Sequence, residues 1–196
     1  MRKLGDILSI KTNNIEPGKG KILISEPFLG DYYFKRSVVL LADHNEEGSF
    51  GLILNKPLDI KLGEVVYDFP DFNAVVYLGG PVESDNLFFI HTLGEQIEGS
   101  LEILSGLYWG GKMEVVKEMM ILKKINPDQI RFYIGYSGWS PNQLKEELER
   151  NAWVVSNTNS KLLLKTNPDQ LWETTLHRLG GDYSYWPKFP IDPMQN

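Results

Sequence analysis

The 196-residue sequence contains no cysteine, and this absence excludes several kinds of site. Disulfide frameworks, thiolate metal sites and cysteine nucleophiles all need that side chain. Histidine is also scarce, with three residues at positions 44, 91 and 177. Metal ligands usually converge from several elements, so the acidic cluster at residues 43–47 is better interpreted as a solvated turn. We therefore expect neither a metal nor a cofactor.

Long hydrophobic runs are missing as well. The longest aliphatic run, residues 38–42, is far shorter than the roughly 20 residues that span a bilayer. Near the N-terminus, Asp6 interrupts the apolar segment that a secretory signal requires. Together with the lack of cysteine, these features predict a soluble cytoplasmic protein with no membrane association.

The sequence also lacks an excess of positive charge. Lysine and arginine total 20 against 26 acidic residues, which gives a formal net charge of −6. Nucleic-acid-binding proteins usually carry a basic surface because much of their affinity comes from contacts with phosphates. The predicted helix at residues 113–124 is locally basic, but a solvated helix face is the favoured interpretation of its lysines. We therefore predict against direct DNA binding as the function.

Short β-prone runs dominate what the sequence does contain, and most follow one another without an intervening helix. They occur at residues 21–25, 38–42, 49–54, 74–78, 87–91, 101–104, 130–134, 153–155 and 161–164. Helical patterns cover residues 62–66, 113–124, 141–150 and 168–179. This order predicts an α+β fold, a single compact domain over residues 1–196 with a mixed, mostly antiparallel sheet flanked by helices. Residues 181–196 form an aromatic and proline-containing C-terminal arm that is expected to be extended. Exposed Tyr185 and Trp186 side chains would indicate a docking arm or a dimer contact.

Residues 134–144 carry the densest structural signals. Two glycines bracket a Tyr-Ser pair and predict a tight turn after the strand at residues 130–134. Ser140 suits a helix N-cap, Pro141 the first helical position and Gln143 the return contact of a capping box. This stretch is therefore predicted to contain a strand end, a glycine turn and a helix start.

A second glycine loop, residues 79–81, also follows a predicted strand. Backbone amides of such loops can bind anions. If the two loops meet in space, they would line a cleft for a small ligand, although turn geometry alone explains the glycines too. The candidate ligand-binding residues are Asn55, Gly79, Gly80, Pro81, Val82, Gly135, Tyr136, Ser137, Gly138, Trp139 and Ser140.

Ser137 raises an enzymatic alternative. Its surroundings distantly resemble the Gly-x-Ser-x-Gly nucleophile elbow of hydrolases, but the second glycine comes one residue early. A hydrolase would also need a base, for which His91 and His177 are the candidates. A turn built of small residues is the favoured interpretation, and no catalytic residue is assigned.

Several short sequence segments, taken in their order along the chain, resemble the YqgE/AlgH family of bacterial proteins. They lie at residues 20–25, 37–41, 51–57, 79–82 and 135–144, with Trp172 following, and the match covers residues 18–180. The resemblance implies a compact α+β domain in a bacterial cytosol. The family is often labelled a transcriptional regulator, although no recognisable DNA-binding motif supports the label, and it brings no established catalytic residues.

These observations predict a non-catalytic binding or regulatory module with a small-ligand cleft. One alternative is a transcriptional regulator that acts through DNA or a protein partner. A second is a hydrolase-like enzyme that uses Ser137 or a histidine. The ligand or protein partner is not identified by the sequence, and a homodimer is left open.

Overall fold

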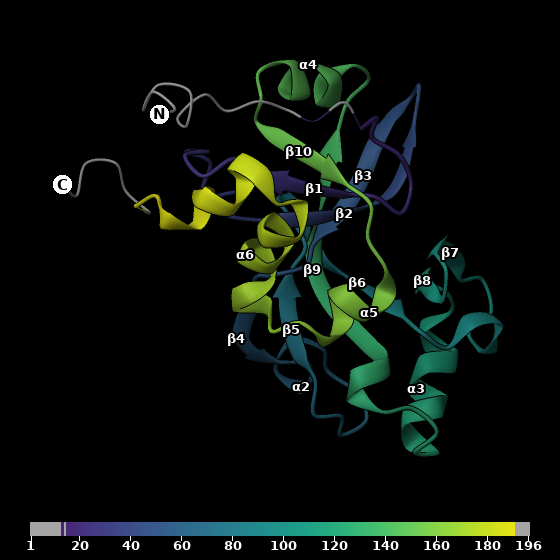
Figure 1. The fold of residues 1–196 in the computed structure, drawn as a ribbon. Coiled ribbons are helices and arrows are strands. Elements are labelled where there is room, and N and C mark those ends of the chain that lie inside the picture. The colour runs from purple at the N-terminus through teal and green to yellow at the C-terminus, as the bar shows by residue number, and fades with distance from the viewer. Residues whose placement is uncertain (1–12, 14, 191–196) are drawn as a thin grey trace, which may run out of the picture.

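Strand β9 (Ile130–Trp139) runs through the middle of a ten-stranded sheet in the computed structural model, which describes residue 13 and residues 15–190. The strand order is β10-β1-β2-β3-β9-β6-β8-β7, and β5, itself paired with β4, lies parallel to β9 (Figure 1). The other strand pairs of the described chain are antiparallel. The α+β prediction with a mixed, mostly antiparallel sheet is therefore confirmed.

The remaining strands are β1 (Ile22–Ser25), β2 (Val38–Asn45), β3 (Gly48–Ile53), β4 (Pro57–Lys61), β5 (Val75–Leu78), β6 (Val82–His91), β7 (Leu101–Leu104), β8 (Leu107–Trp109) and β10 (Trp153–Ser156). The helices are α2 (Leu62–Val65), α3 (Met113–Ile121), α4 (Gln143–Glu149), α5 (Ser160–Lys165) and α6 (Pro168–Leu179), with short 3₁₀ helices η1 (Gly94–Gln96), η2 (Pro127–Gln129) and η3 (Gly181–Lys188). The neighbouring strands β2 and β3 form a hairpin, whereas β4 and β8 had not been predicted as strands.

Helices cover both faces of the sheet and enclose three apolar clusters. On one face, α5, α6 and η3 pack over β1, β2 and β3 (Figure 1). On the other, α4 covers the β10 end of the sheet, while α2 and α3 cover β5, β6 and the start of β9. The helix residues buried in these clusters include Leu163, Leu171, Trp172, Leu176, Leu144, Leu62, Val116, Met119 and Met120.

The predicted tight turn at residues 135–138 is wrong, because β9 continues through it to Trp139. The segment is hydrogen-bonded on both sides, with Gly138 opposite Phe50 of β3 and Tyr136 opposite Val82 of β6. Gly135 has φ +66, a conformation favoured by glycine, and acts as a bulge that shifts the alternation of side chains. Tyr133 and Tyr136 consequently pack on the same cluster.

The helix that follows begins later than predicted. It starts at Gln143, and its N-cap is Asn142 in a left-handed conformation rather than Ser140. The Gln143 side chain nevertheless accepts a hydrogen bond from the backbone N–H of Ser140 at 3.0 Å. The return contact of the capping box is therefore formed, but it closes a turn that precedes the helix.

Two C-terminal predictions also need correction. The apolar run at residues 161–164 forms helix α5 instead of a strand, and Asn159 caps it by accepting from the backbone N–H of Leu162. A short apolar run carries no period that distinguishes helix from strand. The expected extended arm is the 3₁₀ helix η3, in which Trp186 is only 2% exposed while Tyr185 is 47% exposed. Residues 191–196 lie outside the described part of the arm.

By contrast, α6 matches its predicted boundaries: the Asn167 side chain accepts from the backbone N–H of Asp169, and Gly180 ends the helix with φ +68.

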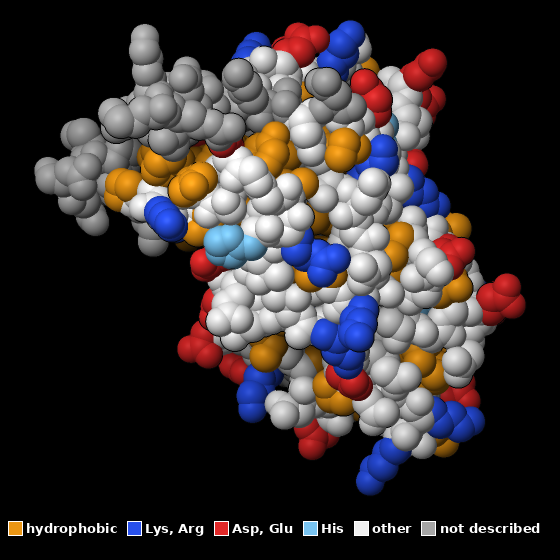
Figure 2. Space-filling model, in the orientation of Figure 1, with side chains coloured by type: hydrophobic (Ala, Val, Ile, Leu, Met, Phe, Trp, Pro, Cys, Tyr) orange, Lys and Arg blue, Asp and Glu red, His pale blue; other side chains and the backbone are white. Residues whose placement is uncertain are grey.

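Within the described residues, no helix combines the length and the hydrophobicity needed to cross a bilayer. Acidic and basic side chains are interspersed over the face shown in Figure 2.

Candidate functional site

The two predicted glycine segments do lie against each other, but they pack backbone to backbone. A Cβ atom on Gly79 would lie 2.1 Å from the carbonyl oxygen of Gly135, and one on Gly80 would lie 2.3 Å from the carbonyl group of Tyr136. The Gly79 N–H already donates to the carbonyl oxygen of Ile134. The glycines therefore permit a close crossing of two chain segments, and the Gly79 amide is unavailable to an anion.

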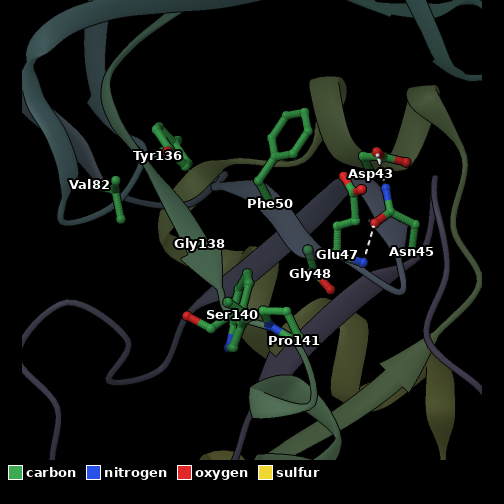
Figure 3. A pocket seen from close by; sticks show the side chains of 12 residues that line it. Asp43, Asn45, Glu47, Gly48, Phe50, Val82, Tyr136, Gly138, Ser140 and Pro141 are labelled. Carbon is green, nitrogen blue, oxygen red and sulfur yellow. Dashed lines mark hydrogen bonds between the residues drawn. The ribbon is translucent and has the colours of Figure 1, made fainter.

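A cavity of about 500 Å³ lies next to this crossing, between the β2–β3 hairpin and the C-terminal half of β9 (Figure 3). We call it the hairpin cavity. Its lining includes five of the predicted residues, Val82, Tyr136, Gly138, Trp139 and Ser140. The hairpin residues that sequence reasoning missed are Asp43, Asn45, Gly48, Ser49, Phe50 and Glu47, with Pro141 from the β9–α4 connection.

The other predicted residues lie elsewhere. Asn55 accepts a hydrogen bond from the backbone N–H of Val38 at 2.8 Å and donates one to the carbonyl oxygen of Arg36 at 2.9 Å, so its side chain joins backbone segments. Pro81 is exposed, and Ser137 is fully buried. Neither these three residues nor Gly79, Gly80 and Gly135 line the hairpin cavity.

The lining of the hairpin cavity is acidic. A carboxylate oxygen of Asp43 accepts from the side-chain amide of Asn45 at 3.0 Å, and Asn45 in turn accepts from the backbone N–H of Glu47 at 2.8 Å. Figure 3 shows these three side chains together on one side of the cavity. Its lining includes Asp43 and Glu47 but no lysine or arginine. Coulomb attraction therefore favours a cationic occupant over an anionic one.

A smaller cavity of about 260 Å³ adjoins the hairpin cavity and is lined by four aromatic side chains: Phe50, Phe88, Trp109 and Tyr136. We call it the aromatic cavity. The ring centroids follow one another in a closed cycle, at 5.2 Å from Phe50 to Trp109 and 5.6 Å from Trp109 to Phe88. The cycle closes through Tyr136, at 5.5 Å from Phe88 and 6.2 Å from Phe50. Phe50 and Tyr136 line both cavities.

The structure does not assemble a triad around Ser137. Its hydroxyl donates to the carbonyl oxygen of Gly79 at 3.0 Å. His91 lies opposite Ile130, seven residues away along β9, which corresponds to about 23 Å of strand. The other candidate base, His177, contacts Glu173 on the exposed side of α6. A buried hydroxyl without a base beside it cannot act as a nucleophile.

A serine–histidine contact does occur at the hairpin, where sequence reasoning had not placed one. The Ser49 hydroxyl and Nδ1 of His44 are 2.6 Å apart, and both residues line a further cavity behind the hairpin. Among the hydrogen bonds of the described chain, none connects His44 to a carboxylate. The pair therefore lacks the orienting acid that completes a triad.

The predicted basic helix carries no excess of positive charge within the bounds of α3, which contains Lys117 together with Glu114 and Glu118. Lys112 forms an ion pair with Glu98, and the ammonium of Lys117 lies 4.9 Å from the centroid of the Phe69 ring. The residues described by the structure contain no group of three or more histidine, aspartate or glutamate side chains placed to hold a metal ion.

Comparisons with known proteins place the chain in a family. The model of the AlgH-like family matches residues 22–184. The UPF0301 proteins of Bacteroides fragilis and Bacteroides thetaiotaomicron are 43% and 44% identical over 192 residues, and each comparison covers 97% of both chains.

Two solved structures share the fold. The solution structure of the AlgH protein from Pseudomonas aeruginosa has a TM-score of 0.70 and 28% identity, and the match covers 91% of this chain and 98% of that one. A crystal structure of a Corynebacterium diphtheriae protein has a TM-score of 0.75 with 20% identity over 91% and 95% of the two chains, which supports the fold alone. The family model and the close relatives together confirm the predicted resemblance, and the chain belongs to the AlgH-like family.

Proposed function

We propose that the protein is a non-catalytic binding module whose small-molecule ligand occupies the hairpin cavity. The observation that carries this proposal is the cavity itself, whose volume of about 500 Å³ falls within the range of roughly 300–1,000 Å³ typical of ligand pockets. It combines aromatic and apolar walls with a few polar groups, the composition that gives ligand sites both affinity and orientation.

A catalytic role has less support. Ser137 is buried and bonded to a backbone carbonyl, and the Ser49–His44 pair has no carboxylate behind the histidine. A regulatory role is compatible with the site, because a ligand between the β2–β3 hairpin and β9 would fix the position of an exposed hairpin tip. A partner protein could then distinguish the liganded from the free state. We place this activity in the bacterial cytosol, supported by the cysteine-free composition.

Gly138→Leu tests the proposal by filling the cavity. Gly138 lies in β9 with an ordinary strand conformation, and a Cβ there would meet Tyr136 Cε2 at 3.3 Å and Val82 Cγ2 at 3.5 Å. A leucine would therefore extend among residues that line the hairpin cavity. Gly63→Leu is the matched control, because a Cβ at this exposed position in α2 meets nothing within 4 Å.

The measurement is a thermal-shift screen of small metabolites, with each hit titrated calorimetrically against the wild type and both variants. We expect hits to bind the wild type and Gly63→Leu equally and to bind folded Gly138→Leu at least about tenfold more weakly. Binding that is not weakened in Gly138→Leu would show that the ligand site is not the hairpin cavity. A screen in which no metabolite binds would contradict the proposal of a small-molecule ligand.

A further inference from the structure

The aromatic cavity is lined by four rings that belong to four different strands. Phe50 is in β3, Tyr136 in β9, Phe88 in β6 and Trp109 at the end of β8. These strands are neighbours in the sheet, in the order β3-β9-β6-β8. All four side chains are only partly buried, so their ring surfaces are accessible from the cavity. No residue of α5 or α6 lines it, so neither helix closes this part of the sheet.

The orientation of the rings suits a cation. The Phe50 ring stands at 74° to Trp109 and 79° to Tyr136, and Phe88 stands at 80° to Tyr136, so three of the four neighbouring pairs are close to perpendicular. The fourth pair, Phe88 and Trp109, is tilted at 36°. The faces of aromatic rings carry partial negative charge and attract cations within about 6 Å of the centroid. Neighbouring centroids are 5.2 to 6.2 Å apart, so a cation seated in the cavity lies close to more than one ring.

The neighbouring carboxylates provide charge complementarity. Asp43 and Glu47 line the hairpin cavity, which shares Phe50 and Tyr136 with the aromatic cavity. In the view of Figure 3, Phe50 lies between Tyr136 on one side and the two carboxylates on the other. No lysine or arginine lines either cavity. The combined site therefore attracts positive charge and opposes a negatively charged occupant.

We propose that the aromatic cavity binds the methylated ammonium head of a small organic cation whose short, polar and uncharged tail extends into the hairpin cavity. The inference rests on the proposed function and specifies the chemistry of its ligand. A volume of about 260 Å³ is smaller than a typical ligand pocket, which suits a head group rather than a whole molecule. Methyl groups bury apolar surface against the rings while the positive charge interacts with their faces. A quaternary ammonium also offers no hydrogen-bond donors, and two of the four walls, Phe50 and Phe88, offer no hydrogen-bonding group.

Three commercially available probes separate the parts of this proposal. Choline carries the trimethylammonium head and a neutral hydroxyethyl tail. Its uncharged isostere 3,3-dimethylbutan-1-ol has the same shape, and glycine betaine has the same head with an anionic tail. Binding is measured by titration calorimetry and by the chemical shift of the methyl protons. We expect choline to bind with a dissociation constant in the millimolar range, an upfield ring-current shift, and an affinity at least about tenfold above that of either comparison compound.

Variants then locate the binding site. Trp109→Leu and Phe88→Leu should each weaken choline binding about fivefold to tenfold, while Tyr67→Leu, at a side chain that is 93% exposed and outside both cavities, should leave it unchanged. The double substitution Asp43→Asn with Glu47→Gln should weaken choline binding severalfold and leave the neutral isostere unaffected. Circular dichroism and amide NMR spectra establish that each variant is folded.

Equal affinity for choline and its neutral isostere would overturn the assignment of a cation, and unchanged choline binding in both ring variants would overturn the assignment of the site. A trimethyllysine peptide that binds when choline does not would overturn the small-molecule assignment. If choline fails to bind while another metabolite binds the wild type but not Gly138→Leu, the inference is wrong and the proposed function stands. If no compound of either set binds, both are wrong.

Discussion

The hydroxyl of Ser137 donates a hydrogen bond to the carbonyl oxygen of Gly79, joining residues 58 positions apart in the sequence. The same carbonyl accepts from the backbone N–H of Ile53, so β3, β9 and the β5–β6 connection meet at this point. Ser137 therefore has a structural role at the crossing of β9 with the β5–β6 connection. This relationship explains why a serine in a glycine-rich segment need not be a nucleophile.

Ser137→Ala should lower the free energy of unfolding by about 1 kcal/mol, the usual net contribution of one hydrogen bond. The loss is modest because the Gly79 carbonyl keeps its bond from Ile53. Urea denaturation followed by tryptophan fluorescence measures the effect. Any ligand binding in the hairpin cavity should persist. Loss of a hydrolytic activity in the folded variant would support the enzymatic alternative and contradict this assignment.

Gly80→Ala should destabilise the protein much more strongly, by at least about 3 kcal/mol, because backbone atoms cannot move aside for the added methyl group. The new Cβ would lie 2.3 Å from the Tyr136 carbonyl group, and Gly80 has φ +153, where side chains are strained. Gly63→Ala serves as a control and should be neutral or slightly stabilising, since α2 offers open space there. Equal urea midpoints for the two variants would show that the close crossing does not exist in solution.

Local signals predicted the elements that local interactions determine. The β2 apolar run and the start of α6 at Pro168 both lie where the sequence indicates them. The segment from Gly135 to Trp139 was misinterpreted because its strand conformation depends on pairing with β3 and β6, which lie about 50–90 residues away. Propensity alone cannot reveal such non-local partners.

The residues of the candidate site likewise divide into those that local sequence signals predicted and those that only non-local strand pairing brings in. Gly138 and Ser140 were proposed from their own segment, whereas Asp43 and Phe50 join them only because β3 pairs with β9. The polar cluster at residues 43–47 was a signal for these missing walls, but without the strand order it indicated only a solvated turn.

Glu147→Ala should lower the free energy of unfolding by about 2–4 kcal/mol. One carboxylate oxygen of Glu147 accepts from the indole N–H groups of both Trp139 and Trp153, at 2.8 Å and 2.7 Å. Both tryptophans are at most 5% exposed, so the substitution leaves two buried donors without their acceptor.

Urea denaturation compares Glu147→Ala with Glu149→Ala, which removes an exposed glutamate from the same helix and should change stability by no more than about 0.5 kcal/mol. The tryptophan emission of native Glu147→Ala should also differ from that of the wild type. Similar losses in the two variants would mean that the shared carboxylate does not account for the effect.

His91 should make the protein less stable below about pH 6.5. Burial lowers the pKa of His91 from its ordinary value of 6.5, an effect only partly opposed by the hydrogen bond from the ring to Gly110. Nδ1 of the ring accepts from the backbone N–H of Leu93 at 3.2 Å, and Nε2 donates to the carbonyl oxygen of Gly110 at 3.0 Å. Protonation would place a second donor against the Leu93 N–H. The native state therefore holds His91 neutral, while the unfolded chain binds a proton at this position once the pH falls below 6.5.

Between the lowered native pKa of His91 and pH 6.5, the unfolded state thus binds more protons than the native state. The free energy of unfolding therefore decreases as the pH falls through this interval, by up to about 1.4 kcal/mol per pH unit. Urea midpoints at pH 7.5 and 5.5 measure the change. His91→Gln, which cannot be protonated, should be less stable at pH 7.5 but should lose less stability on acidification than the wild type. If His91→Gln lost as much stability on acidification as the wild type, groups other than His91 would cause that loss. The reason is that the substitution removes only the titration of the histidine between Leu93 and Gly110.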